Sequence, residues 1–134
     1  MTTFTGISHV DLTVSDVEAS AEWYAKVLGL KRLARQDLDG RVMVVLAHPE
    51  TRLVIGLNQH EGRTADRFDE RNPGLDHIGF SVEQRDDLVA LDKHLTALRV
   101  DHSPVTDAPS GSGTALVFRD PDNIQLEYWW TAPR

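Results

Sequence analysis

The chain has 134 residues, of which 40% are hydrophobic and 26% are charged, as expected of a globular protein with one domain. The net charge of −7 and the lack of a basic patch argue against a nucleic-acid partner, and the absence of cysteine excludes disulfides and thiolate metal ligands. No apolar run reaches the length of a membrane span and the first residues do not resemble a signal peptide, so we expect a cytoplasmic protein with no membrane partner.

The first half of the chain predicts a strand, a helix and three further strands. Residues 4–14 alternate between apolar and polar side chains, which is typical of a half-buried strand. Ser15, with Glu18 three residues later, predicts a capping box at the start of a helix, and Gly29 is expected to end that helix. The three further strands are expected at residues 31–37, 41–47 and 52–58.

The second half repeats this plan. Residues 60–73 are polar and without a clear period, so we expect a linker between two modules, 1–59 and 74–134, of a single domain. After it we expect a strand at 75–82, a helix at about 84–98, and strands near 103–106, 114–119 and 124–130.

One strand is present twice. Residues 6–14 (GISHVDLTV) reappear about half a chain length later as residues 74–82 (GLDHIGFSV), and each copy carries one histidine near its middle, His9 and His77. A duplicated scaffold that keeps a histidine at the same point in both halves suggests a pair of metal ligands or catalytic groups that face each other.

The alternation of side chains adds a third candidate ligand. His9, His77 and Glu127 each lie on the strand face opposite the apolar set. If the sheets curve with the helices outside, these three side chains point into one cavity. Two imidazoles and one carboxylate suit a divalent first-row metal, Fe(II) above all, with Mn, Ni, Co or Zn also suited. Asp11 and Ser81 share these faces and are expected to hydrogen-bond the ligands.

Gly56 marks a break in the duplication. The segment 53–57 corresponds to the segment 124–128, which places Gly56 at the position equivalent to Glu127. Since glycine has no side chain to coordinate a metal, we predict three protein ligands and a fourth corner open to solvent or substrate.

Other residues are candidates for contacts with a small-molecule substrate. Gly56 and its face neighbours Val54 and Asn58 are expected to line the site. Trp129 shares a face with Glu127 and would form a wall for an aromatic substrate, and Arg119 either pairs with an anionic substrate or is a surface or dimer contact. His60 is either a general base that reaches the cavity or a solvated loop residue, and the catalytic group is otherwise unknown.

Four segments together resemble the vicinal oxygen chelate superfamily, also called the glyoxalase/bleomycin resistance protein/dioxygenase superfamily. They are Ser8-His9-Val10, residues 23–30 (WYAKVLGL), residues 75–80 (LDHIGF) and residues 118–127 (FRDPDNIQLE), which together span essentially the whole chain. The resemblance implies an α+β fold in which two βαβββ modules form a cupped, eight-stranded mixed sheet with helices outside, often as a homodimer. It also implies that His9, His77 and Glu127 are the metal ligands.

The resemblance leaves three functions open. Extradiol dioxygenases use a set of two histidines and one glutamate with no fourth ligand, so a dioxygenase-type enzyme acting on an oxygen-chelating small molecule is the leading hypothesis. Glyoxalase-type isomerase or lyase chemistry is the alternative, although glyoxalase I enzymes and methylmalonyl-CoA epimerases use Glu or Gln where this chain has Gly56. A metal-free, antibiotic-binding protein similar to bleomycin resistance proteins fits the acidic charge but not the intact ligand set.

Overall fold

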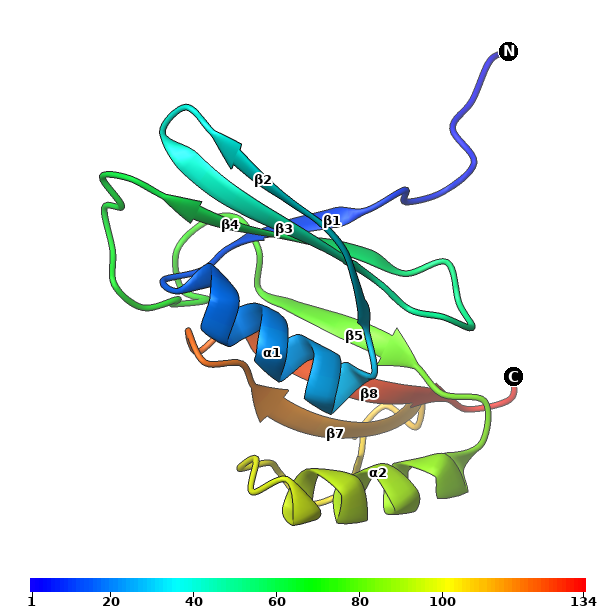
Figure 1. Ribbon diagram of the computed structural model, residues 1–134. Coiled ribbons are helices and arrows are strands. Elements are labelled where there is room, and N and C mark those ends of the chain that lie inside the picture. The colour runs from blue at the N-terminus through cyan, green and yellow to red at the C-terminus, as the bar shows by residue number, and fades with distance from the viewer. The chain divides into compact units, whose positions relative to one another are not determined.

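A computed structural model describes all residues from 1 to 134 and contains two compact units, Met1–Asp66 and Arg67–Arg134 (Figure 1). The boundary falls inside the predicted linker. Each unit has the order strand, helix and three strands, and each builds one four-stranded sheet. The predicted α+β class and the duplicated βαβββ plan are therefore confirmed.

The first unit is a sheet covered on one face by a helix (Figure 1). The sheet order is β1-β4-β3-β2, with β1 parallel to β4 and the other pairs antiparallel. The helix contacts all of β2, β3 and β4, and its Tyr24 is completely buried. The elements are β1 (Val10–Thr13), α1 (Val17–Leu28), β2 (Lys31–Leu38), β3 (Arg41–Ala47) and β4 (Val54–His60).

The second unit repeats this arrangement. Its sheet order is β5-β8-β7-β6, again with the first strand parallel to its neighbour. The helix contacts β7 and β8 through the fully buried Leu88 and Leu95. The elements are β5 (His77–Ser81), α2 (Arg85–Ala97), β6 (Thr106–Asp107), β7 (Gly113–Arg119) and β8 (Gln125–Thr131).

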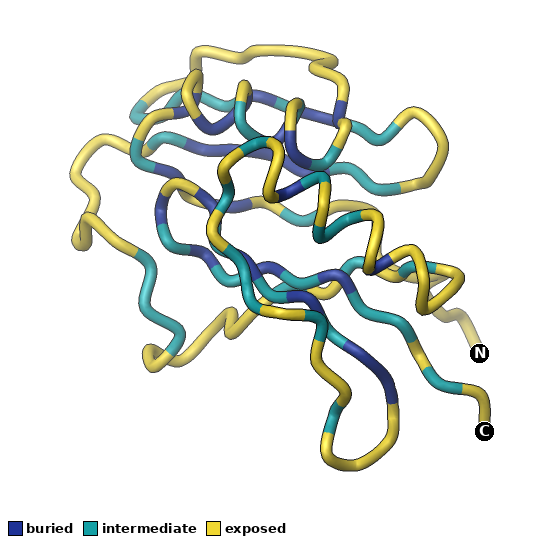
Figure 2. Tube along the Cα trace, turned by 90° about the horizontal axis from the view of Figure 1, so that it is seen from below, coloured by how far each residue is buried: buried dark blue, intermediate teal, exposed yellow.

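Buried and more exposed positions alternate along β7 and β8, as the sequence pattern predicts (Figure 2), whereas residues 55–58 of β4 are all buried. Ile55 and Leu57 on β4 are completely buried, and so is Leu126 on β8. Because neighbouring side chains on a strand point to opposite faces, the residues between them lie on the face turned away from the helix. Neither helix is long and apolar enough to cross a membrane.

Several predicted boundaries are wrong. The strands predicted at 52–58 and near 103–106 are β4 (Val54–His60) and β6 (Thr106–Asp107). The first strand begins at Val10 and not at residue 4, because its pairing with β4 starts at Val10 and Gly6 has a φ of 128° that interrupts the extended chain. The cap of α1 is Asp16 and not Ser15: the Oδ1 atom of Asp16 accepts a hydrogen bond from the backbone N–H of Ala19 at 3.1 Å.

The side chain of Glu18 has a different role from the predicted capping box. It forms ion pairs with Arg32 and Arg35 on β2. The predicted end of α1 is confirmed, since Gly29 adopts a left-handed φ of 71° there.

Candidate functional site

A histidine and a glutamate meet in the second unit. The Nε2 atom of His77, the first residue of β5, lies 3.2 Å from the Oε1 atom of Glu127 on β8. The two strands are parallel, and their register pairs Glu127 with Gly79. A methyl group added at Gly79 would lie 3.3 Å from Oε1 of Glu127, so the absent side chain makes room for the carboxylate.

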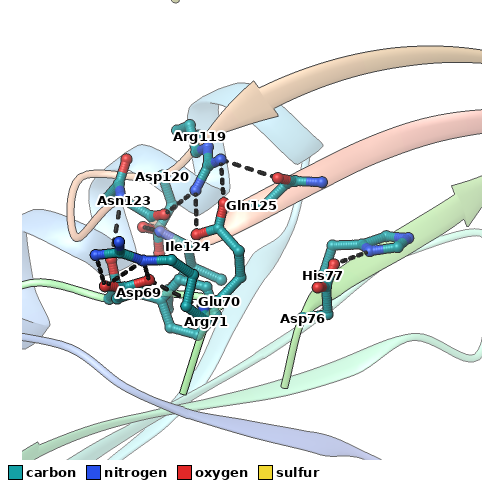
Figure 3. A network of polar contacts seen from close by, with 11 residues as sticks. Asp69, Glu70, Arg71, Asp76, His77, Arg119, Asp120, Asn123, Ile124 and Gln125 are labelled. Atoms are coloured by element: carbon teal, nitrogen blue, oxygen red, sulfur yellow. Dashed lines mark hydrogen bonds and ion pairs between the residues drawn. The ribbon is translucent and has the colours of Figure 1, made fainter. Parts of the chain in front are cut away.

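Asp76 orients the imidazole of His77. The Oδ1 atom of Asp76 lies 2.6 Å from Nδ1 of His77 and accepts a hydrogen bond from it (Figure 3). The other ring nitrogen, Nε2, is the one that approaches Glu127. The hydrogen bond to Asp76 raises the pKa of His77 above its ordinary value, and the charge of Glu127 adds to the effect while partial burial opposes it. The carboxylate is the more enclosed partner, with 15% of its side chain exposed against 40% for His77.

The pair fits two adjacent ligands of one cation. Donors at bond lengths of about 2.1 Å that lie at right angles on a metal are about 3.0 Å apart, close to the distance between His77 and Glu127. Neither unit by itself gathers three or more His, Asp or Glu side chains in a metal-binding group. The second unit thus brings two of the three predicted ligands together, and the third, His9, belongs to the first unit.

His9 lies directly before β1 and is exposed. The Nδ1 atom of His9 lies 2.5 Å from the hydroxyl oxygen of Ser8. This contact matches the one between Nδ1 of His77 and the carboxylate of Asp76. In both units, therefore, the side chain of the residue that precedes the histidine contacts Nδ1 and not Nε2.

The sequence predicts that Asp11 and Ser81 hydrogen-bond the ligands, but the residues that contact the Nδ1 atoms of the two histidines are Ser8 and Asp76. The signal that could have found Ser8 and Asp76 is their shared place, one residue before each histidine in the duplicated strand.

The register of the first sheet supports the equivalence of Gly56 and Glu127. Asp11 on β1 pairs with Gly56 on β4, as Gly79 on β5 pairs with Glu127 on β8. A methyl group added at Gly56 would lie only 2.7 Å from Cγ of Asp11. The space above Gly56 is thus filled by the carboxylate of the neighbouring strand.

A buried amide fixes this carboxylate. The Nδ2 atom of Asn58 donates a hydrogen bond to Oδ2 of Asp11 at 3.2 Å, and Nη1 of Arg41 donates to Oδ1 of Asn58 at 2.6 Å. Only 3% of Asn58 is exposed. Asn58, whose contact with a substrate stays a prediction, connects Arg41 to Asp11 on the face turned away from α1.

Arg119 is engaged within the second unit. Its guanidinium donates to both carboxylate oxygens of Glu70, at 2.7 and 3.1 Å, to Oε1 of Gln125 and to the carbonyl oxygen of Asn123 (Figure 3). This pairing lowers the pKa of Glu70 to about 2. Four internal bonds hold the guanidinium in place, and its pairing with an anionic substrate stays a prediction. Arg119 ties the segment before β5 to the β7–β8 turn.

The remaining candidates occupy three different places. Val54 starts β4 on the same face as Gly56, and the indole of Trp129 donates a hydrogen bond to Thr131 on β8. His60 is the last residue of β4 and not part of the linker. It lines a cavity of about 520 Å³ in the first unit, together with Arg41 and Arg63.

Comparison with known proteins agrees with this architecture. Residues 6–128 match the sequence profile of the Glyoxalase/Bleomycin resistance protein/Dioxygenase superfamily. The ethylmalonyl-CoA/methylmalonyl-CoA epimerase of Cereibacter sphaeroides is 34% identical over 91 residues, which cover 65% of this chain and 66% of that protein. The aligned part is thus just under two thirds of that relative.

Solved structures of the same fold are numerous. The glyoxylase/bleomycin resistance protein/dioxygenase domain from Frankia sp. EAN1pec is 39% identical, with a TM-score of 0.87 and coverage of 97% of this chain and 94% of that chain. The fosfomycin resistance protein FosX of Listeria monocytogenes, in complex with Mn(II) and sulfate, is 16% identical, with a TM-score of 0.69 and coverage of 97% and 95%. At this identity, the likeness to FosX shows the fold alone.

Proposed function

Because the chain belongs to the glyoxalase/bleomycin resistance protein/dioxygenase superfamily, we propose that it is a divalent-metal enzyme acting on a small molecule that chelates the metal through neighbouring oxygens. One observation carries this proposal: the 3.2 Å approach of Nε2 of His77 to Oε1 of Glu127, which suits two ligands of a shared cation. His9 is the third ligand in this proposal, with its imidazole held by Ser8.

The donor set indicates which metals to test. Two imidazoles and one carboxylate suit Fe(II) best, and Mn(II), Ni(II), Co(II) and Zn(II) are accepted by similar sites. When bound, the cation supplies a Lewis acid that polarises a substrate oxygen. The chain supplies the ligands and, through Ser8 and Asp76, their orientation.

For the reaction, we favour proton transfer at a carbon next to a carbonyl group. The support is the epimerase relative, 34% identical over 91 residues, whose named substrates are ethylmalonyl-CoA and methylmalonyl-CoA. Dioxygenase chemistry, the leading hypothesis from the sequence, is the second candidate because a site with two histidines and one carboxylate leaves positions open for substrate and dioxygen.

Metal analysis tests the proposal. Protein purified without added metal is expected to carry one divalent ion per metal site, and His9→Ala, His77→Ala and Glu127→Gln are expected to lose it. His48→Ala, a turn histidine outside the proposed site, is the matched control and keeps its metal. Absence of metal from the wild-type protein under every loading condition would overturn the proposal and favour the metal-free, antibiotic-binding alternative.

Two assays separate the candidate reactions. Exchange of the α-proton of methylmalonyl-CoA in D₂O, followed by NMR, is expected for the epimerase-type activity and to disappear in His77→Ala. Oxygen uptake with a panel of catechols, by protein loaded with Fe(II), is expected only for the dioxygenase. The same proposal includes a homodimer in the cytoplasm, and light scattering on the purified protein tests the dimer.

A further inference from the structure

His102, a histidine outside the proposed metal site, has both of its ring nitrogens engaged. Its Nδ1 atom lies 2.7 Å from the backbone carbonyl oxygen of Val100, and its Nε2 atom lies 2.5 Å from Oδ1 of Asp92 on α2. A carbonyl and a carboxylate are both acceptors, so each ring nitrogen needs a proton in order to donate to its neighbour. A ring with two protons is an imidazolium, and the two contacts therefore fit the charged form of His102.

The ring is enclosed at the place where α2 meets the second sheet. Only 12% of the His102 side chain is exposed, and the backbone of His102 forms a bridge with Phe118 on β7. The carboxylate of Asp92 reaches the ring from α2, and the hydroxyl oxygen of Thr96, one helical turn later, lies 3.4 Å from Nε2. The ring thus contacts groups of the helix while its own backbone pairs with the sheet.

These surroundings favour the protonated ring. The hydrogen bond to the carbonyl of Val100 is the largest cause that raises the pKa of His102 above its ordinary value, and partial burial opposes it. The carboxylate of Asp92 raises this pKa further, and so does the charge of Asp101 beside it in the chain.

The segment that carries His102 follows a strained turn. Directly after α2, Arg99 has a φ of 57°, a left-handed conformation that glycine adopts easily and arginine does not. Beyond the turn, the backbone N–H of Ser103 donates to the carbonyl oxygen of Val117 on β7 at 2.8 Å. His102 lies between the strained turn and this bond, and its ring connects the segment back to Asp92.

We propose that His102 is a pH-sensitive switch that holds the α2–β6 connection, residues 98–105, in place while its ring is protonated. When the ring loses one proton, one of its two nitrogens faces an acceptor without a hydrogen, and the connection loosens. The folded protein binds this proton more tightly than the unfolded chain does. The stabilisation is therefore complete below the unfolded pKa of about 6.5 and is lost as the pH rises through the higher folded pKa.

An NMR titration of the His102 ring tests the protonation. The ring resonances are identified by their absence from His102→Gln, and their midpoint is expected above the ordinary histidine value of about 6.5. Asp92→Asn keeps the size of the side chain and removes its charge, and is expected to lower the midpoint by about one pH unit. Asp86→Asn makes the same change in the first turn of the same helix and is expected to leave the midpoint where it is in the wild type.

Amide hydrogen exchange tests the loosening. After correction for the intrinsic pH dependence of exchange, protection of the Ser103 N–H is expected to fall about tenfold as the pH passes the midpoint. In Asp92→Asn the fall is expected at the lower midpoint of that variant, and in His102→Gln no such step is expected. The Val82 N–H, which donates to the carbonyl of Trp129 in the same unit, is the internal reference and keeps its protection.

Two results would overturn the proposal. The first is a His102 midpoint at or below the ordinary histidine value, or one that Asp92→Asn does not lower. The second is a raised midpoint with constant protection of Ser103, because His102 would then titrate without holding the connection.

Discussion

The carboxylate of Asp11 and the backbone of Gly56 face each other across the parallel strands β1 and β4, and the first fills the space that a side chain on the second would need. A substitution at either residue is therefore expected to change the packing of the other, although the two are far apart in the sequence.

Gly56→Ala is expected to displace Asp11, because the new methyl group would lie 2.7 Å from Cγ of Asp11. The carboxylate must give up its hydrogen bond from Asn58 to make room, so the predicted cost is about 1–2 kcal/mol of unfolding free energy. Chemical denaturation measures the effect. Gly79→Ala, whose methyl group would lie 3.3 Å from Glu127, is the matched control with the smaller effect.

Asn58→Ala removes the buried amide between Arg41 and Asp11. Loss of both hydrogen bonds is expected to lower the free energy of unfolding by about 1–3 kcal/mol in urea, because the side chains of Arg41 and Asp11 each lose a hydrogen-bond partner. Asn72→Ala, at an exposed position, is the control and is expected to change little. Equal stability of the two variants would contradict the proposed role of this amide.

Asp76→Ala is expected to weaken metal binding about 10- to 100-fold, because the imidazole of His77 loses the hydrogen bond that orients it. Ser8→Ala is expected to act in the same direction through His9. Isothermal titration with Mn(II) or Co(II) measures both. Asp101→Ala, an exposed acidic residue outside the site, should bind as the wild type does; a similar loss there would point to net charge instead.

The ion pair between Glu70 and Arg119 is expected to make stability depend on pH in the acid range. The pKa of Glu70 is lowered from 4.5 to about 2 in the folded protein, mainly by hydrogen bonds from Arg119. The folded state then favours the charged form, so the contribution is complete above about pH 4.5 and is lost as the pH falls toward 2. Thermal unfolding between these pH values should show a shallower decline for Glu70→Gln than for the wild type. Glu83→Gln, an exposed control, should follow the wild type.

Asn123 is expected to tolerate glycine better than alanine. Its φ of 70° is left-handed, and its side chain donates a hydrogen bond to the carbonyl oxygen of Phe68. Asn123→Ala loses the bond and strains the backbone, at a cost of about 2 kcal/mol, whereas Asn123→Gly loses only the bond. Denaturant unfolding of both variants separates the two effects; equal losses would show that the backbone carries no strain.

The fold could be predicted from the sequence because alternation along the strands and the duplication agree. The apolar positions of the alternating pattern are the ones that the fold buries, as at Ile55, Leu57 and Leu126. The errors fall at element ends, where a single interaction decides: Asp16 caps α1 because its side chain, and not that of Ser15, reaches the N–H of Ala19.

The candidate site could be predicted only in part. Parity along the strands places His77 and Glu127 on one face, and the structure brings them to 3.2 Å. Alternation along a strand shows which face a side chain lies on, but not how far it reaches over the neighbouring strand. The sequence pattern therefore revealed the glycine at position 56 but not that Asp11 extends over it. Likewise, the sequence predicts for Arg119 either an anionic substrate or a surface or dimer contact, and only the folded chain shows that Glu70 pairs with it.

The exchange of carboxylate and glycine between facing strands also bears on how such a site diverges after gene duplication. Cross-strand partners lie within one side-chain length of each other, so an acidic group can pass from one strand to the next through two substitutions while the backbone stays unchanged. Two copies of one module can in this way each keep a carboxylate at this pair of facing positions, although the carboxylate stands at different places in their sequences.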